Sequence, residues 1–438
     1  MVAPFFLVLL FQIIKTMTEE FLHYIWKFKL YQLPTNLVSG ESISILDPGQ
    51  HNTNAGPDFF NSRIKIENTV WAGNVEIHIK SSDWFAHKHQ EDKAYDNIIL
   101  HVVFENDKDI KRQNGETIPV IEMKGKINEA LYDRYEAFMR SKNEVACNLL
   151  IQGVDRFLIN NWVDRLLVER LEIKATEIKE RLAFNGNNWE QTFYELLARN
   201  FGFKTNAVAF ELLSQSLPLL YLGKHKNNKL QIDALLFGQS GLLSTKCDDK
   251  YFLELKKEYE FLQRKFSLIP IDPHLWRFMR MRPSNFPTIR IAEFADLIFK
   301  SSHLFSKILE VEKFPDLLPL FDVSPSEYWY DHYTFGKTSV KRKKKLGKNA
   351  IYLIAINTIV PFVFVYGRLK NEQKYIDRAL KFLDQIPGES NTIIKKWEEM
   401  GMNTHTAFNT QALIQLKNNY CIKKRCLQCS IGNALLNR

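Results

Sequence analysis

The chain has 438 residues, of which 45% are hydrophobic and 25% are charged, and its formal net charge is +9. This composition excludes wholesale disorder, and the length predicts two or three domains. The positive charge permits a polyanionic partner such as nucleic acid without establishing one. Five cysteines in a chain of this length do not make a disulfide scaffold, which predicts a reducing, cytoplasmic location.

Residues 1–16 contain an apolar run from Val2 to Ile14. The run is too short to span a membrane, because a spanning helix needs about 20 apolar residues. It also lacks the basic start and the small-residue cleavage site of a signal peptide. A helix signal begins at Thr18, which can cap an acidic first turn. We therefore expect residues 1–16 to be a dispensable extension or a misassigned start, and we expect no membrane association.

Residues 17–125 predict a mixed α/β domain. Its strands are short β-branched or alternating runs separated by turn-forming residues. The expected elements, in chain order, are a helix over 18–32, strands over 42–46, 59–66 and 69–80, a helix or ordered loop over 82–94, and strands over 97–104 and 118–123.

Residues 126–417 predict a larger all-α domain, because apolar residues there recur at helical spacing. The expected helices cover 156–181, 188–200, 206–216, 248–265, 288–308, 350–366, 371–385 and 388–400. Residues 418–438 form a cysteine-containing tail. The predicted fold class is thus α+β, with an N-terminal mixed domain, a helical domain and the tail.

The strand over 69–80 carries its polar residues on one face. Successive side chains alternate along a strand, so one side presents Asn74, Glu76, His78 and Lys80, and the other presents Val75, Ile77 and Ile79. Asp58 begins the preceding strand, and together with Glu76 it has the oxygen ligands to hold Mg²⁺ or Mn²⁺. His78 or Lys80 would then orient or deprotonate a water molecule. The plainer interpretation is that Asp58 caps a turn and Glu76 pairs with a cation.

Histidines are concentrated in the same region, where five of the eleven lie between residues 51 and 101. His87, His89 and His101 form a second candidate site. Imidazole suits Zn, Fe, Ni or Mn, and Asp92 or Asp96 would complete the ligand shell of His87 and His89. The alternative is an exposed connection, with His101 as a core residue whose hydrogen bonds are satisfied.

Three cysteines of the tail, Cys421, Cys426 and Cys429, are separated by four and two residues. This spacing fits thiolate ligation of zinc or of an iron–sulfur cluster. The fourth ligand would be Cys147 or His405, with Cys247 less favoured. Free thiols in a helical tail are the alternative.

Basic residues suited to phosphate contacts occur in two places of the helical region. Arg280, Arg282 and Arg290 alternate with aromatic residues, a pattern that can support nucleic-acid binding. Lys343 lies in a lysine-rich loop that would contact phosphates or remain solvated. Arginines between helices also commonly have a purely structural role.

Asp58 and the strand Glu76-Ile77-His78 resemble the core motif of PD-(D/E)XK nucleases, with His78 at the position of the motif lysine. The resemblance implies a restriction-endonuclease-like sheet in which Asp58 and Glu76 bind the metal used to cleave DNA or RNA. The histidine puts cleavage in question, but not metal binding. Some nucleases of this superfamily hold an iron–sulfur cluster through one upstream cysteine and three near the C-terminus, a layout that Cys147 and the tail resemble.

From Met17 onward, several segments resemble a bacterial family described as domain of unknown function 2851. They include GPDFFNSRIKI, WAGNVEIHIKSSDWFAHKH, LLFGQSGLL and MRPSNFPTIRIAEFADLI. This resemblance implies no particular activity. Two functions follow from the residues: a metal-dependent nuclease, or a non-catalytic nucleic-acid-binding protein with a structural metal. A hydrolase of another phosphorylated or sugar substrate is a third.

Overall fold

The computed structural model describes residues 17–438 apart from 34 and 113–114, so the expectations for residues 1–16 lie outside the described residues. The chain divides into two compact units. The first combines the part before residue 159 with residues 419–438, and the second comprises residues 159–418. The first unit thus extends beyond the boundary predicted near residue 125, and it includes the cysteine-containing tail.

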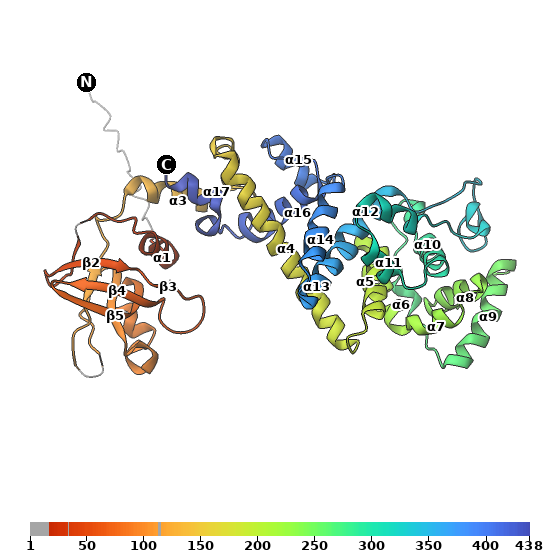
Figure 1. Ribbon diagram of the computed structural model, residues 1–438, viewed down its shortest axis with the longest axis horizontal. Helices are drawn as coiled ribbons and strands as arrows, with labels where there is room; N and C mark the ends of the chain where they lie inside the picture. The colour runs from red at the N-terminus through yellow and green to blue at the C-terminus, as the bar shows by residue number, and fades with distance from the viewer. Residues whose placement is uncertain (1–16, 34, 113–114) are drawn as a thin grey trace, which may run out of the picture. The chain divides into compact units, whose positions relative to one another are not determined.

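The first unit contains a mixed sheet with short helices (Figure 1). Its elements before the helical unit are α1 (Glu19–Lys27), β1 (Thr35–Asn36), β2 (Ser42–Asp47), β3 (Gln50–His51), β4 (Phe59–Ile66), β5 (Thr69–Lys80), α2 (Asp83–Ala86), η1 (His89–Glu91), η2 (Lys93–Tyr95), β6 (Ile98–Glu105), β7 (Val120–Glu122), α3 (Glu129–Arg140) and η3 (Ile151–Gly153). The tail adds η10 (Cys426–Gln428) and α17 (Ser430–Leu436).

The sheet has seven strands, in the order β1-β2-β4-β5-β6-β7, with β3 also paired to β4. Strand β4 runs antiparallel to both β2 and β5, whereas β6 is parallel to β5 and β7 is parallel to β6. A parallel pair needs a crossover connection, and residues 81–97 provide it between β5 and β6. The predicted strands over 59–66 and 69–80 coincide with β4 and β5.

Helix α1 forms because Thr18 caps it, accepting a hydrogen bond from the N–H of Phe21 at 3.3 Å. The helix buries one apolar side, which comprises Phe21, Leu22, Tyr24, Ile25 and Trp26. It ends at Lys27, earlier than the predicted residue 32, since Lys29 adopts a left-handed backbone conformation with φ of 53°.

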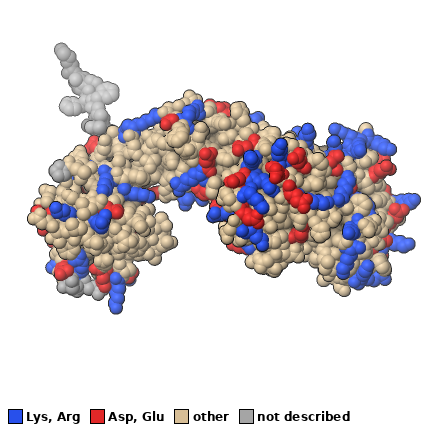
Figure 2. All heavy atoms as spheres, viewed as in Figure 1, with Lys and Arg blue, Asp and Glu red and all other residues tan. Residues whose placement is uncertain are grey.

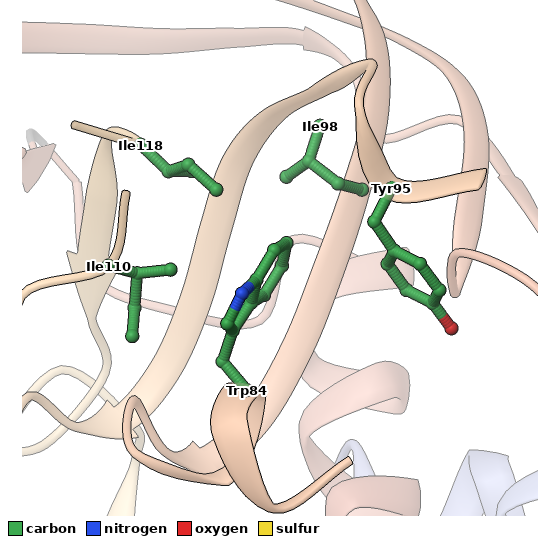
Figure 3. Close-up of a cluster of buried hydrophobic side chains, with 5 residues drawn as sticks. All are labelled: Trp84, Tyr95, Ile98, Ile110 and Ile118. Carbon is green, nitrogen blue, oxygen red and sulfur yellow. The ribbon is translucent and has the colours of Figure 1, made fainter. Parts of the chain in front are cut away.

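An apolar cluster holds the crossover between β5 and β6 in place. Its side chains point toward one another in Figure 3, and they are Trp84, Tyr95, Ile98, Ile110 and Ile118. All five are at least nine-tenths buried. The crossover, predicted as a helix or an ordered loop, therefore consists of the short helix α2 followed by the turns η1 and η2.

The second unit is built mainly of helices (Figure 1). They are α4 (Arg156–Phe184, which begins in the first unit), α5 (Trp189–Phe201), α6 (Phe203–Ser216), α7 (Leu219–Lys224), α8 (Lys229–Gln239), α9 (Lys250–Phe266), α10 (Pro287–Lys300), α11 (Leu304–Glu310), α12 (Lys348–Ile354), the π-helix η8 (Ala355–Ile359), α13 (Val360–Lys370), α14 (Gln373–Gln385), α15 (Thr392–Glu399) and α16 (Ala407–Leu416). Strands β8 (His332–Thr334) and β9 (Lys337–Thr338) form a two-stranded sheet, and in the sequence they fall between α11 and α12.

The prediction of a single helix over 288–308 is wrong, because the chain forms two helices there, α10 and α11. The break falls at Ser301, which is extended, and at His303, which has a left-handed φ of 54°. By length and composition alone, Lys348–Lys370 is the one helical run of the described residues apolar enough to cross a membrane. Since 78% of its most apolar window is buried inside the protein, core packing accounts for this run equally well.

Arg290 is not a surface residue, so its predicted contact with nucleic acid is wrong. The residue lies in α10 and is 8% exposed. Its guanidinium donates to Glu293 at 2.7 Å and to Asn285 at 2.6 Å, and it stacks over the ring of Phe203. Arg290 therefore serves to neutralise a buried carboxylate.

We expect Arg290→Met to lower the free energy of unfolding by about 3 kcal/mol, because it leaves the buried Glu293 carboxyl without its partner. Adding Glu293→Leu removes the stranded group and should recover most of the loss. Urea denaturation followed by circular dichroism measures both effects. Arg282→Met, at an exposed position, is the matched control, and equal stability of all the variants would contradict the assignment.

Candidate metal centre

Asp58 and Glu76 converge from neighbouring strands. A carboxylate oxygen of Glu76, which is 5% exposed, accepts a hydrogen bond from the backbone N–H of Asp58 at 3.1 Å. The Asp58 carboxylate in turn accepts from the N–H of Ile77 at 3.0 Å. Each acid is thus fixed by the strand that carries the other, and the two negative groups face the same region.

A β-bulge sets this geometry. The pairing of β4 with β5 shifts between Phe59 and Ser62, and Asn61 takes a left-handed φ of 56°. The N–H of Asn61 donates to the side chain of Asn74 at 3.3 Å. Asn74, predicted on the same face of the strand as Glu76, therefore stabilises the bulge beside the acids.

His78 lies at the centre of a chain of imidazole rings. Its Nδ1 shares a hydrogen bond with Nε2 of His101 at 2.8 Å, and its Nε2 shares one with Nδ1 of His87 at 3.1 Å. Nε2 also lies 3.6 Å from Oε1 of Glu76, and Nε2 of His89 lies 3.3 Å from the same oxygen. One ligand atom from each of His78, His87 and His89 falls within 4.8 Å of the other two.

The crossover between β5 and β6 delivers two of these histidines. His87 is the C-cap of α2, and the next residue, Lys88, adopts a left-handed backbone conformation before His89. The ring of Tyr95 stacks on His89 at 3.8 Å between ring centroids, and Trp84 meets His89 edge-on at 5.3 Å. The apolar cluster of Figure 3 thus supports the histidines directly.

The structure merges two sites that the sequence analysis treated separately. His87 and His89 join Glu76 and His78, and they do not form a site with the aspartates that follow them. Asp92 accepts the N–H of Ala94 as a helix cap, and Asp96 is exposed. Both aspartates are therefore wrong as the expected partners of His87 and His89.

Helix α1 contributes a residue that the sequence analysis did not select. Nε2 of His23 lies 3.1 Å from the Asp58 carboxylate, and its ring centroid lies 5.2 Å from that of His51. His23 falls between the buried pairs Phe21-Leu22 and Tyr24-Ile25. That position, a histidine within the apolar stripe of an amphipathic helix, is the signal that points to the site.

Burial controls the charges in the centre. Burial and the neighbouring rings of His101, His89 and His87 lower the pKa of His78 to about 2, and burial lowers the pKa of His101 to about 3. Both imidazoles are therefore neutral. Burial thus takes the pKa of His78 far below the near-neutral value of an exposed imidazole, which argues against the expected role of His78 in deprotonating water. Burial raises the pKa of Glu76, and its hydrogen bond with His89 opposes the shift.

A neutral His78 carries one ring proton. When that proton is on Nδ1 and bonded to His101, the lone pair of Nε2 points toward His87 and Glu76. Neutral imidazole with a free lone pair is the form that binds metals. A hydrogen bond from the far nitrogen is the usual way of fixing that tautomer.

Among the histidines of the first unit that the structure describes, three ring nitrogens are buried without a hydrogen bond of normal geometry, namely His23 Nε2, His89 Nε2 and His101 Nδ1. Two of them nevertheless face carboxylates, as His23 faces Asp58 and His89 faces Glu76. Two nitrogens bound to one tetrahedral metal ion lie about 3.3 Å apart. Three of the pairs in the centre have a similar spacing: His78 with His87 at 3.1 Å, His89 with Glu76 at 3.3 Å and His78 with Glu76 at 3.6 Å.

The remaining sequence candidates lie elsewhere. Lys80 is exposed at the end of β5, and its backbone N–H donates to Asp83 at 2.9 Å. Arg280, Arg282 and Lys343 are exposed in the second unit. Basic and acidic side chains are intermixed over that unit on the face seen in Figure 2.

The cysteines of the tail lie close to Cys147. All four cysteines, Cys147, Cys421, Cys426 and Cys429, line one small cavity of the first unit. His405 is exposed, and Cys247 belongs with His405 to the second unit. Of the three residues considered as a fourth ligand, the structure thus brings Cys147 to the trio. Burial raises the pKa of Cys147 to about 12 and that of Cys426 to about 11.

The fold and this centre define an α+β protein with a histidine-rich candidate metal centre on a mixed sheet. The family model described as "Protein of unknown function (DUF2851)" matches residues 19–392, and the chain belongs to this family. No curated protein and no solved structure matches the chain.

We expect His89→Ala and His87→Ala to weaken the binding of Zn²⁺ or Mn²⁺ by at least about 10-fold, because each removes one nitrogen from the centre. Isothermal titration calorimetry measures the affinity. His405→Ala, an exposed histidine of the second unit, is the matched control and should leave binding unchanged. Equal affinities in all these proteins would place the metal elsewhere.

Proposed function

We propose that the first unit is a metal-dependent phosphodiesterase that hydrolyses DNA or RNA. The observation that carries the proposal is the convergence of Glu76, His78, His87 and His89 beside a second carboxylate, Asp58. His78 is buried on the sheet, whereas His87 is exposed. The centre is therefore accessible to solvent on the side of His87, where a substrate would enter.

The donor set favours a first-row transition metal. Three imidazoles and a carboxylate suit Mn²⁺, Fe²⁺ or Zn²⁺, whereas Mg²⁺ prefers oxygen ligands and retained water. Bound at this centre, such an ion would polarise a phosphate oxygen and lower the pKa of a bound water. The Mg²⁺ expected from the acids alone is therefore the less suitable ion.

Asp58 and His23 form the candidate proton-handling pair. The Asp58 carboxylate lies 3.1 Å from the His23 ring, and its bond to the N–H of Ile77 holds it in place. An imidazole oriented by a carboxylate is a common general base. His23 is partly exposed, with 18% of its side-chain surface accessible, so water can reach it. His78 is unsuited to this role, because its lowered pKa makes it a weak base.

The order and direction of the strands also support the proposal of a nuclease. The antiparallel strands β2, β4 and β5 are followed by a crossover to the parallel strand β6. Asp58 precedes β4 and Glu76 lies on β5, as the resemblance to PD-(D/E)XK nucleases requires. A neutral His78 cannot supply the positive charge of the motif lysine. In this proposal His78 is a metal ligand, and Asp58 with His23 handles the proton.

A non-catalytic nucleic-acid-binding protein is the second candidate. The hydrogen bonds from backbone N–H groups to both carboxylates favour it, because such bonds give Asp58 and Glu76 structural roles of their own. Binding that is sensitive to salt but unaffected by Asp58→Asn, with no turnover, would distinguish this function from hydrolysis.

We expect the purified full-length protein to cleave plasmid DNA or RNA in the presence of Mn²⁺. Glu76→Gln and Asp58→Asn should lower the rate by about 100-fold or more, because they remove a metal ligand and the partner of the base. Lys80→Ala, at an exposed position, should retain most of the activity. Gel electrophoresis of the products measures cleavage.

Two controls make the result decisive. Calorimetry should show that Asp58→Asn still binds the metal, so that its loss of rate reflects chemistry. If metal-loaded wild-type protein cleaves neither DNA nor RNA, the nuclease proposal is wrong. Unchanged rates in both carboxylate variants would equally contradict it.

A further inference from the structure

Four of the five cysteines converge on one cavity in the first unit. Cys147 lies just before α4, whereas Cys421, Cys426 and Cys429 follow the whole helical unit in the sequence. Their cavity measures about 20 Å³ and is otherwise walled by Phe138, Ala146, Tyr420, Arg425 and Gly432. Convergence from such distant parts of a chain needs a physical reason, because thiols alone attract one another weakly.

Hydrogen bonds fix the tail against helices of the same unit. The hydroxyl of Tyr24, in α1, donates to the side chain of Asn433 at 2.8 Å and accepts from Asn437 at 2.7 Å. Arg134, in α3, donates to the carbonyl oxygen of Leu436 at 2.9 Å. The segment that carries the three cysteines is therefore ordered around the cavity.

Tight turns direct the three cysteines of the tail into the cavity. Lys424 adopts a left-handed φ of 51°, and the N–H of Arg425 donates back to the carbonyl of Tyr420 at 2.9 Å. Gly432 allows the next close approach, since a Cβ atom there would lie 2.4 Å from the carbonyl oxygen of Cys426. The backbone is thus shaped so that Cys426 and Cys429 line the same cavity as Cys147.

We propose that Cys147, Cys421, Cys426 and Cys429 bind one thiophilic metal centre through their four thiolates. No disulfide joins these four cysteines, so a disulfide does not explain their convergence. Cysteine thiolate is the ligand that zinc and iron–sulfur centres prefer, and four of them complete such a site. Each thiol would lose its proton to solvent as the sulfur–metal bond forms. This site is independent of the proposed hydrolytic activity.

Two occupants share this chemistry, and they differ in size. A cavity of this volume has room for a single ion. A zinc ion, however, would draw its sulfurs to about 3.8 Å from one another. Among the described residues, no three of the cysteine sulfurs lie within 4.8 Å of one another. An iron–sulfur cluster holds its thiolates farther apart, because several metal atoms lie between them.

Metal analysis of the full-length protein tests the proposal. The protein carries His87→Ala and His89→Ala together, which weakens the histidine centre, and it is purified without oxygen. We expect either about one zinc per chain, or iron and acid-labile sulfide in equal amounts with a visible absorption band. The first result identifies a zinc site and the second an iron–sulfur cluster. Less than about 0.1 equivalent of either metal would overturn the proposal.

Cysteine variants then locate the metal. Cys147→Ser and Cys426→Ser should each lose most of it, whereas Cys247→Ser, at the one cysteine outside the cluster, should keep it all. Thiol alkylation of the folded wild-type protein gives a second readout that does not depend on the folding of these variants. A chelator should speed alkylation of the four clustered cysteines but not of Cys247. Alkylation that is independent of chelator at all five positions would contradict the site.

Discussion

The hydrogen bond between His78 and His101 is the constraint on which the candidate centre depends. It joins the parallel strands β5 and β6 on the face where Glu76 stands opposite His101 in the strand register. Because both rings are buried and neutral, the bond leaves the outer nitrogen of His78 directed at His87 and Glu76. The sheet thus supplies a rigid base, and the crossover adds the less buried residues His87 and His89.

Much of the sheet could be predicted because its strands alternate clearly. The bounds of β4 and β5 coincide with the predicted strands, and turn residues separate them. The site was predictable only in part. Local spacing placed Glu76 and His78 on one face, but it could not show that the fold brings His23 to Asp58 or His89 to Glu76. Those contacts depend on how α1 and the crossover pack, which no local pattern encodes.

The helical unit shows where periodicity fails. Helix α8 was missed because Ile232 to Gln239 are all buried, so no polar face marks the helical period. Arg290 was a candidate for phosphate contact because it alternates with aromatic residues, yet its hydrogen bonds with Glu293 and Asn285 fit the structural role that was the alternative. In both places the surroundings of the residue in the folded protein, rather than its type, determine whether it is buried.

The first unit is discontinuous in the sequence, and this affects how it can form during synthesis. Residues 419–438 belong to it, yet the ribosome produces them after the entire helical unit. The sheet, α1 and α3 therefore emerge long before the segment that packs on Tyr24 and Arg134. Until then the surface that this segment later covers stays open to solvent, so the first unit is completed only when synthesis of the chain ends.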